Sequence, residues 1–143
     1  MQARTLKVLF LCTGNSARSL MAEAVMNAQS AGVNRAFSAG SRPKGAPHPT
    51  AIQVLERAGY ETANLRSKSW DEFSTDSEQR LDVVITLCDS AAAEQCPVWF
   101  GAPETLHWGL PDPAAIENPD ECRRAFEQTL AAIEQRVEAF LRA

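Results

Sequence analysis

LKVLFLCTGNSARS, residues 6–19, passes from an apolar run into a chain of small residues that ends in Arg18-Ser19. The run from Leu6 to Leu11 is rich in strand-forming residues, which is typical of a central strand in a parallel sheet. A second run of this kind spans residues 81–87. Each predicted strand ends at a cysteine, Cys12 in the first case and Cys88 in the second.

Helical patterns follow and separate these strands. Apolar residues recur at helical spacing over residues 19–31, and a second helix is expected from Pro49 to Gly59. Shorter strands are expected over residues 34–38 and, more weakly, 105–110. Strands that alternate with helices indicate an α/β layered domain with right-handed crossovers. Ligands bind such domains beyond the carboxyl ends of the strands.

The last helix has the clearest signals. Asn118 is placed to cap it, Pro119 suits its first position, and Asp120 and Glu121 favour its positive end. One apolar stripe follows, and we expect it to cover the sheet. The stripe consists of Phe126, Leu130, Ile133, Val137 and Leu141.

Length and composition limit the possible functions. The chain has 143 residues, enough for one domain over 1–143, and 14 basic against 18 acidic side chains give a net charge of −4. This balance argues against nucleic acid as a partner. No run approaches the roughly 20 apolar residues of a membrane span and no export signal is recognised, so we expect a cytoplasmic protein without a membrane partner. Four scattered cysteines do not suggest a disulfide scaffold.

The small residues between the first strand and the first helix predict an anion site. Small side chains let backbone N–H groups converge at a helix N-terminus, where the dipole favours negative charge. Arg18 adds a fork suited to two oxygens of a tetrahedral oxyanion. The predicted substrate-binding residues are Thr13, Gly14, Asn15, Ser16, Ala17, Arg18 and Ser19.

At the base of this loop, Cys12 is the candidate nucleophile. The positive field is expected to depress its pKa and keep it a thiolate near neutral pH, and Ser19 is placed to donate its hydroxyl to the sulfur. Gly14 and Asn15 are residue types that tolerate left-handed backbone angles in a tight loop. The proline-rich segment 41–49 reads as a surface loop that borders the site.

The pattern Cys12, five residues, Arg18-Ser19 near the N-terminus resembles the low-molecular-weight protein tyrosine phosphatase superfamily. Its arsenate reductase branch is also similar in Thr86-Leu87-Cys88 with Cys96-Pro97 and in residues 107–113, HWGLPDP. The resemblance implies a single three-layer domain with a central, mainly parallel four-stranded sheet flanked by helices. It also implies that Asp112, between two prolines, is the general acid.

Cys88 and Cys96 distinguish the two activities of this family, because arsenate reduction needs further thiols and phosphatase activity does not. If residues 89–95 are helical, the two thiols lie about 12 Å apart, whereas a disulfide needs Cα atoms within about 7 Å. We therefore expect this segment to unwind when they bond. The resemblance implies a relay: Cys12 attacks arsenate, Cys88 attacks Cys12 as arsenite leaves, and Cys96 attacks Cys88 before a thioredoxin-type dithiol reduces the disulfide.

The implied substrate is arsenate, with phosphate as a competing oxyanion, and no bound cofactor or metal is expected beyond an external dithiol. Glutaredoxin or another small thiol stays open as the reductant, and we expect a monomer. The alternatives are a tyrosine phosphatase acting through a Cys12-phosphate intermediate and an anion-binding redox sensor. Two blander interpretations of the thiols are buried packing and a zinc site with His48, His107 or Cys122, for which no ligand spacing fits.

Some thioredoxin-coupled members hold a potassium ion near the loop. The corresponding residues here are Asn15, Glu23 and Ser38, but the place of a further carboxylate falls near Lys68. The Lys68 ammonium is expected to occupy the cation position beside Glu23. We therefore predict no activation by potassium.

Overall fold

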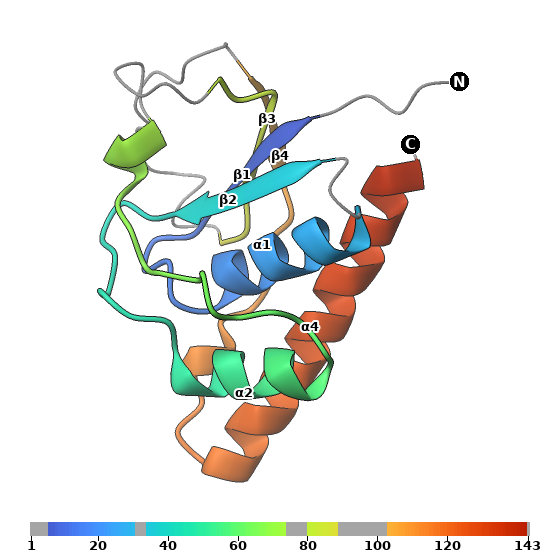
Figure 1. The fold of residues 1–143 in the computed structure, drawn as a ribbon. Helices are drawn as coiled ribbons and strands as arrows, with labels where there is room; N and C mark the ends of the chain where they lie inside the picture. The colour runs from blue at the N-terminus through green and yellow to red at the C-terminus, as the bar shows by residue number, and fades with distance from the viewer. Residues whose placement is uncertain (1–5, 31–33, 74–79, 89–102, 143) are drawn as a thin grey trace.

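The structure is a computed structural model that describes residues 6–30, 34–73, 80–88 and 103–142. Four parallel strands form one sheet in the order β2-β1-β3-β4 (Figure 1). The strands are β1 (Lys7–Leu11), β2 (Arg35–Ala39), β3 (Val83–Thr86) and β4 (Glu104–His107). The expected α/β domain around a parallel four-stranded sheet is confirmed.

Three described helices pack together on one face of this sheet (Figure 1). They are α1 (Arg18–Gln29), α2 (Pro49–Arg57) and α4 (Pro119–Arg142). The 3-10 helix η1 (Trp70–Phe73) lies against the opposite face, and a second one, η2 (Pro113–Ala115), precedes α4. No helix among the described residues is both long enough and apolar enough to cross a membrane.

Alternation along β1 divides its side chains between the two faces. Val8 and Phe10 pack with α1, α2 and α4, whereas Leu9 and Leu11 pack with Phe73 from η1. All four side chains have no exposed surface. An apolar run buried on both faces is the pattern of a central parallel strand, as the sequence predicts.

The beginning of α4 and its buried stripe also agree with the sequence. Asn118 Oδ1 accepts a hydrogen bond of 3.0 Å from the N–H of Glu121, so the expected cap is present. Phe126, Ile133 and Val137 are fully buried, and Leu130 is nearly so. The stripe covers the other helices and the sheet rather than offering a free face.

The element boundaries differ from the predictions by a few residues. Helix α1 ends at Gln29, and β2 is shifted by one residue to Arg35–Ala39. The largest difference is β4, which ends at His107 instead of Leu110. Beyond it the chain still follows β3, because the N–H of Leu110 donates to the carbonyl of Leu87 over 2.9 Å, but it no longer has strand geometry.

The strand order places a crevice at the end of β1. From β1 the chain crosses to β2 on one side, whereas β3 lies on the other side. The loops that follow β1 and β3 therefore diverge at the carboxyl edge of the sheet, which is where open α/β sheets bind ligands. Cys12 and Cys88 follow these two strands.

Candidate active site

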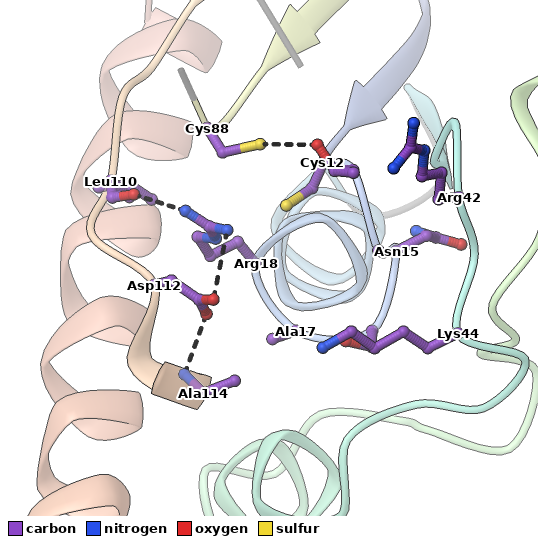
Figure 2. Close-up of a pocket in the computed structure, with 13 residues that line it drawn as sticks. Cys12, Asn15, Ala17, Arg18, Arg42, Lys44, Cys88, Leu110, Asp112 and Ala114 are labelled. Carbon is purple, nitrogen blue, oxygen red and sulfur yellow. Dashed lines mark hydrogen bonds and ion pairs between the residues drawn. The ribbon is translucent and has the colours of Figure 1, made fainter. Parts of the chain in front are cut away.

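A cavity of about 530 Å³ opens at this edge of the sheet. Its floor is the loop between β1 and α1, and its walls come from segments after β2, β3 and β4 (Figure 2). The lining residues are Cys12, Thr13, Gly14, Asn15, Ser16, Ala17, Arg18, Arg42, Lys44, Cys88, Leu110, Asp112 and Ala114. The structure thus brings every predicted site residue to the cavity wall except Ser19, which is buried beneath the loop, and Cys96, which lies outside the described residues.

The carbonyl groups of the loop are bonded on its outer side. Three of them accept hydrogen bonds from backbone N–H groups of residues 42–48. Because C=O and N–H point in opposite directions across a trans peptide, the N–H groups that follow turn toward the cavity. The bonds join Arg42 N to Thr13 O (3.0 Å), Lys44 N to Gly14 O (3.0 Å) and His48 N to Ser16 O (2.7 Å).

Asn15 stabilises the tight turn of this loop. Its φ of 44° is left-handed, as expected for this residue type, and its fully buried side chain bonds in two directions. Oδ1 accepts from the N–H of Lys68 and Nδ2 donates to Ser19 Oγ, both over 2.8 Å. A bond from the Ser19 hydroxyl to Cys12 stays a prediction.

Gly14 serves a different purpose from the one expected. It is not among the described glycines with positive φ, so the loop does not need its left-handed freedom. Its missing side chain instead makes room for Lys44, whose Cε lies 3.2 Å from the position of an added Cβ. The glycine therefore lets the Lys44 side chain lie against the loop.

Gly40 allows an even closer approach from the end of β2. A Cβ added there would lie 2.4 Å from the carbonyl oxygens of both Cys12 and Thr13. On its other side Gly40 is held by segment 68–70: its N–H donates to Lys68 O (3.0 Å), and its carbonyl accepts from Trp70 N (2.9 Å). The sequence interpretation did not include Gly40.

Two thiols meet at the floor of the cavity. Cys12 and Cys88 are each about 5% exposed, they contact one another, and neither is in a disulfide. Thr13 Oγ1 lies 3.7 Å from Cys88 Sγ (Figure 2). Sheet pairing explains this contact, because Leu11 is level with Thr86 in the ladder between β1 and β3.

The expected low pKa of Cys12 is wrong for this arrangement. The hydrogen bond with the Cys88 thiol and the burial of the sulfur raise the pKa of Cys12, while Arg18 and the N–H of Gly14 lower it only in part. The prediction considered the positive field of the loop alone. The Cys88 thiol and the burial of the sulfur together disfavour the charged form more than this field favours it.

The Arg18 side chain lies at the wall of the cavity that Leu110 and Asp112 form. Its side chain is 11% exposed; Nη1 donates to Leu110 O over 2.8 Å and Nη2 lies 3.9 Å from Asp112 Oδ2. Nε is buried without a hydrogen-bond partner in the described part of the chain. An unpaired buried donor at a cavity wall favours a bound anion, because the ligand would supply the missing acceptor.

Asp112 is well placed for proton transfer at the cavity mouth. Its side chain is 43% exposed, and Oδ1 accepts a hydrogen bond of 3.0 Å from the N–H of Ala114 (Figure 2). This bond caps η2, which begins at Pro113. The carboxyl group is thereby fixed while it stays open to the cavity and to solvent.

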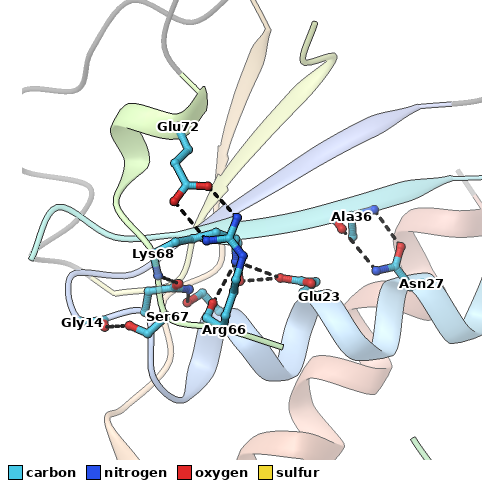
Figure 3. A network of polar contacts seen from close by, with 11 residues as sticks. Gly14, Glu23, Asn27, Ala36, Arg66, Ser67, Lys68 and Glu72 are labelled. Atoms are coloured by element: carbon cyan, nitrogen blue, oxygen red, sulfur yellow. Dashed lines mark hydrogen bonds and ion pairs between the residues drawn. The ribbon is translucent and has the colours of Figure 1, made fainter. Parts of the chain in front are cut away.

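A buried ion pair lies behind the loop. Lys68 Nζ is 3.7 Å from Glu23 Oε1 and donates to Arg66 O over 2.9 Å, and Ser38 Oγ donates to the same glutamate oxygen over 2.6 Å (Figure 3). Burial raises the pKa of Glu23 and lowers that of Lys68. The predicted placement of the Lys68 ammonium beside Glu23 is confirmed.

The remaining candidates have structural partners. The His48 ring stacks at 4.9 Å on Phe126, His107 Nδ1 lies 2.7 Å from Thr86 Oγ1, and Cys122 Sγ contacts Pro113 O at 3.5 Å. Among the described residues, no group of three His, Cys, Asp or Glu side chains gathers as a metal ion would require.

Sequence reasoning missed four lining residues, of which Arg42 and Lys44 are charged, whereas Leu110 and Ala114 are apolar. The segment that carries the two charged residues was expected to border the site, and the cavity lining confirms this. The sequence did offer one indication of their place, because both are basic residues in a loop expected beside an anion site. Nothing in their local sequence indicated which way their side chains would point.

The fold and the loop define a family with a cysteine nucleophile and a neighbouring arginine. Residues 7–143 match the family model described as low molecular weight phosphotyrosine protein phosphatase, and the chain belongs to this family. Within this family, several similar proteins of known name are arsenate reductases. An arsenate reductase of Halalkalibacterium halodurans is 34% identical over 134 residues, which cover 93% of each chain.

Two further proteins agree with this relative. An arsenate reductase of Bacillus subtilis strain 168 is 35% identical over 121 residues, 85% of this chain and 84% of that protein. A solved structure described as an arsenate reductase in the phosphate binding state has a TM-score of 0.78 at 29% identity, covering 96% of this chain and 97% of that one. The predicted resemblance to arsenate reductases of this superfamily is confirmed.

Proposed function

We propose that this protein reduces arsenate to arsenite in the cytoplasm, through a thiol relay that begins at Cys12. The contact of two buried thiols, Cys12 and Cys88, neither of them in a disulfide, at the floor of an anion-binding cavity carries the proposal. Hydrolysis of a phosphate ester through this loop needs only one thiol. A second thiol touching the nucleophile is what a two-electron reduction requires.

The first step is the attack of Cys12 on arsenic. Loop N–H groups and Arg18 hold the oxyanion, the Cys12 thiol gives its proton to an oxygen of the bound oxyanion, and a Cys12 S–As bond forms as hydroxide leaves. Asp112 supplies the proton, so that water departs. The buried Nε of Arg18 offers one more donor for the charge that develops on the oxygens.

The second step transfers electrons. The Cys88 thiolate attacks Cys12 Sγ, the S–As bond breaks, and its electron pair stays on arsenic, which leaves as arsenite. The product on the protein is a Cys12–Cys88 disulfide. Cys96, which lies outside the described residues, then attacks Cys88, and the Cys12 thiolate is released.

An external dithiol completes the cycle, and we propose thioredoxin for it. It reduces the Cys88–Cys96 disulfide by thiol exchange, so no bound cofactor is needed. Phosphate has the same shape and charge as arsenate and competes for the loop, but phosphorus(V) does not accept electrons from thiols. In this proposal the protein acts as a monomer.

The decisive experiment measures arsenate-dependent oxidation of NADPH with thioredoxin and thioredoxin reductase. The wild type, Cys12→Ser, Cys88→Ser and Cys96→Ser are compared, with Cys122→Ser as the matched control, since this buried cysteine does not line the cavity. The first three variants are expected to lose turnover, and the control to keep it. If Cys88→Ser and Cys96→Ser both turn over like the wild type, the relay is wrong and a phosphatase becomes the better interpretation.

A further inference from the structure

Two positively charged side chains line the cavity beyond the loop, and the proposed reaction uses neither. Arg42 and Lys44 come from the segment after β2. Both are exposed, and they lie on the side of the cavity opposite Arg18 and Asp112 (Figure 2). The loop therefore lies between a buried cation on one side and two exposed cations on the other.

The backbone holds both residues against the loop. Their N–H groups donate to the carbonyls of Thr13 and Gly14, each over 3.0 Å. Ser67 reinforces this arrangement, because its hydroxyl accepts from the N–H of Gly45 and donates to Gly14 O, each over 3.2 Å. The stem of Lys44 lies over Gly14, which has no side chain to displace it.

The charges of Arg42 and Lys44 are not neutralised locally. Neither forms an ion pair with a carboxylate of the described residues. Among the described lining residues, Asp112 is the one carboxylate, and it faces Arg18. Three cations against one anion give these described residues a charge of +2 in a chain whose net charge is −4.

We infer that Arg42 and Lys44 form an outer capture site, where a tetrahedral oxyanion is held before it moves to the loop and Arg18. The inference rests on the proposed function, because it takes the substrate to be a dianion of the arsenate and phosphate type. The cavity of about 530 Å³ extends from the loop to Arg42 and Lys44, so an oxyanion has room to lie beside these two residues.

Capture of this kind has a defined kinetic signature. The two charges attract the oxyanion on its way in and continue to act on it across the cavity once it lies in the loop. Because this longer-range attraction is the same in the ground state and the transition state, it lowers KM and leaves kcat unchanged. Exposed charges are screened by salt, so their contribution to kcat/KM shrinks as ionic strength rises. Clefts lined by charges of one sign raise association rates by about 10- to 1,000-fold. For only two exposed side chains we expect an effect near the lower end of this range.

The test is the double variant Arg42→Gln/Lys44→Met. Methionine keeps an apolar stem over Gly14 and removes the charge. We expect KM for arsenate to rise about 3- to 10-fold at low salt with kcat unchanged, and the difference to fade near about 0.5 M salt. The control is Arg57→Gln/Arg136→Gln, two exposed residues that do not line the cavity; both variants carry a net charge of −6, from −4 − 2.

Calorimetric titration with inorganic phosphate provides a readout independent of turnover. The double variant is expected to bind phosphate more weakly than the charge-matched control at low salt, and equally at high salt. If the wild type does not reduce arsenate, the proposed function fails, and this titration still tests the capture site. If the wild type turns over but the double variant matches the control in KM, phosphate affinity and salt dependence, the capture site is refuted; a loss of kcat with unchanged KM refutes it too.

Discussion

Gly40 gives the sharpest test of how the loop is held, through the substitution Gly40→Ala. The new methyl group would lie 2.4 Å from the carbonyl oxygens of Cys12 and Thr13, whereas ordinary contacts begin at 3.4 Å. One side must therefore move by about 1 Å, from 3.4 − 2.4. Gly40 cannot retreat easily, because segment 68–70 holds it through two backbone hydrogen bonds. The movement falls on the loop that begins at Cys12.

A misplacement of about 1 Å at a reacting group costs about 100-fold in rate. We therefore expect Gly40→Ala to lower kcat for arsenate reduction about 100-fold and to weaken phosphate binding. Crowding of a packed site costs about 1–3 kcal/mol of unfolding free energy, so the Tm should fall by about 3–10 °C. Turnover is measured well below this Tm, with calorimetry for phosphate and circular dichroism for unfolding.

Gly59→Ala is the control for stability alone. Gly59 ends α2 with a φ of +88°, and a Cβ there meets nothing within 4 Å. Strain in the left-handed region costs about 1 kcal/mol, but nothing connects this position to the loop. The control should lose stability and keep its turnover. If Gly40→Ala retains wild-type kcat and phosphate affinity, the close approach of Gly40 does not position the loop and the reasoning fails.

Four further predictions follow from the charges. Cys88→Ala should lower the pKa of Cys12, because the Cys88 thiol is the largest cause that raises it; thiolate absorbance against pH measures this, and an unchanged pKa contradicts it. The pKa of His48 is lowered from its ordinary value of 6.5, first because the ring is partly buried and second because the Lys44 charge is near. The unfolded chain therefore binds a proton at His48 more readily than the folded chain does. The unfolding free energy should therefore drop as the pH falls through 6.5 toward 5, and less so in His48→Asn, as urea titrations would show. Lys68→Met should destabilise the fold by about 1–3 kcal/mol at pH 8, where Glu23 is left charged and buried, and by less at pH 5, since the pKa of Glu23 is raised. Wild-type turnover should be the same in sodium and potassium salts, and a clear gain in potassium would contradict the assignment of Lys68 as the built-in cation.

Features set by local sequence were predictable. The anion loop is one, because small residues between an apolar run and a helix leave few other arrangements. Asn118 at the start of α4 is another, since its cap depends on the next three residues only. The parallel character of the sheet followed from two apolar runs separated by helical patterns, whereas its four strands were implied by the family resemblance and their order was not predicted.

Features that depend on contacts between distant segments were not predictable. The pKa of Cys12 depends on the depth of its burial and on a thiol that is 76 positions away, from 88 − 12. Arg42 and Lys44 reach the cavity because their backbone bonds to the loop, and the need for glycine at position 40 arises from the same packing. None of these contacts leaves a periodic or motif signal in the chain.

The order of the strands also has an evolutionary consequence. Because β1 and β3 are hydrogen-bonded neighbours, the chain just beyond β3 lies beside Cys12, which follows β1. A phosphatase-type loop on this sheet therefore acquires a contacting second thiol by one substitution, at position 88, without any rebuilding of the backbone. The pairing of the two strands thus places the side chain at position 88 beside Cys12, so the contact between the two thiols depends on the sheet and not on the sequence of the loop.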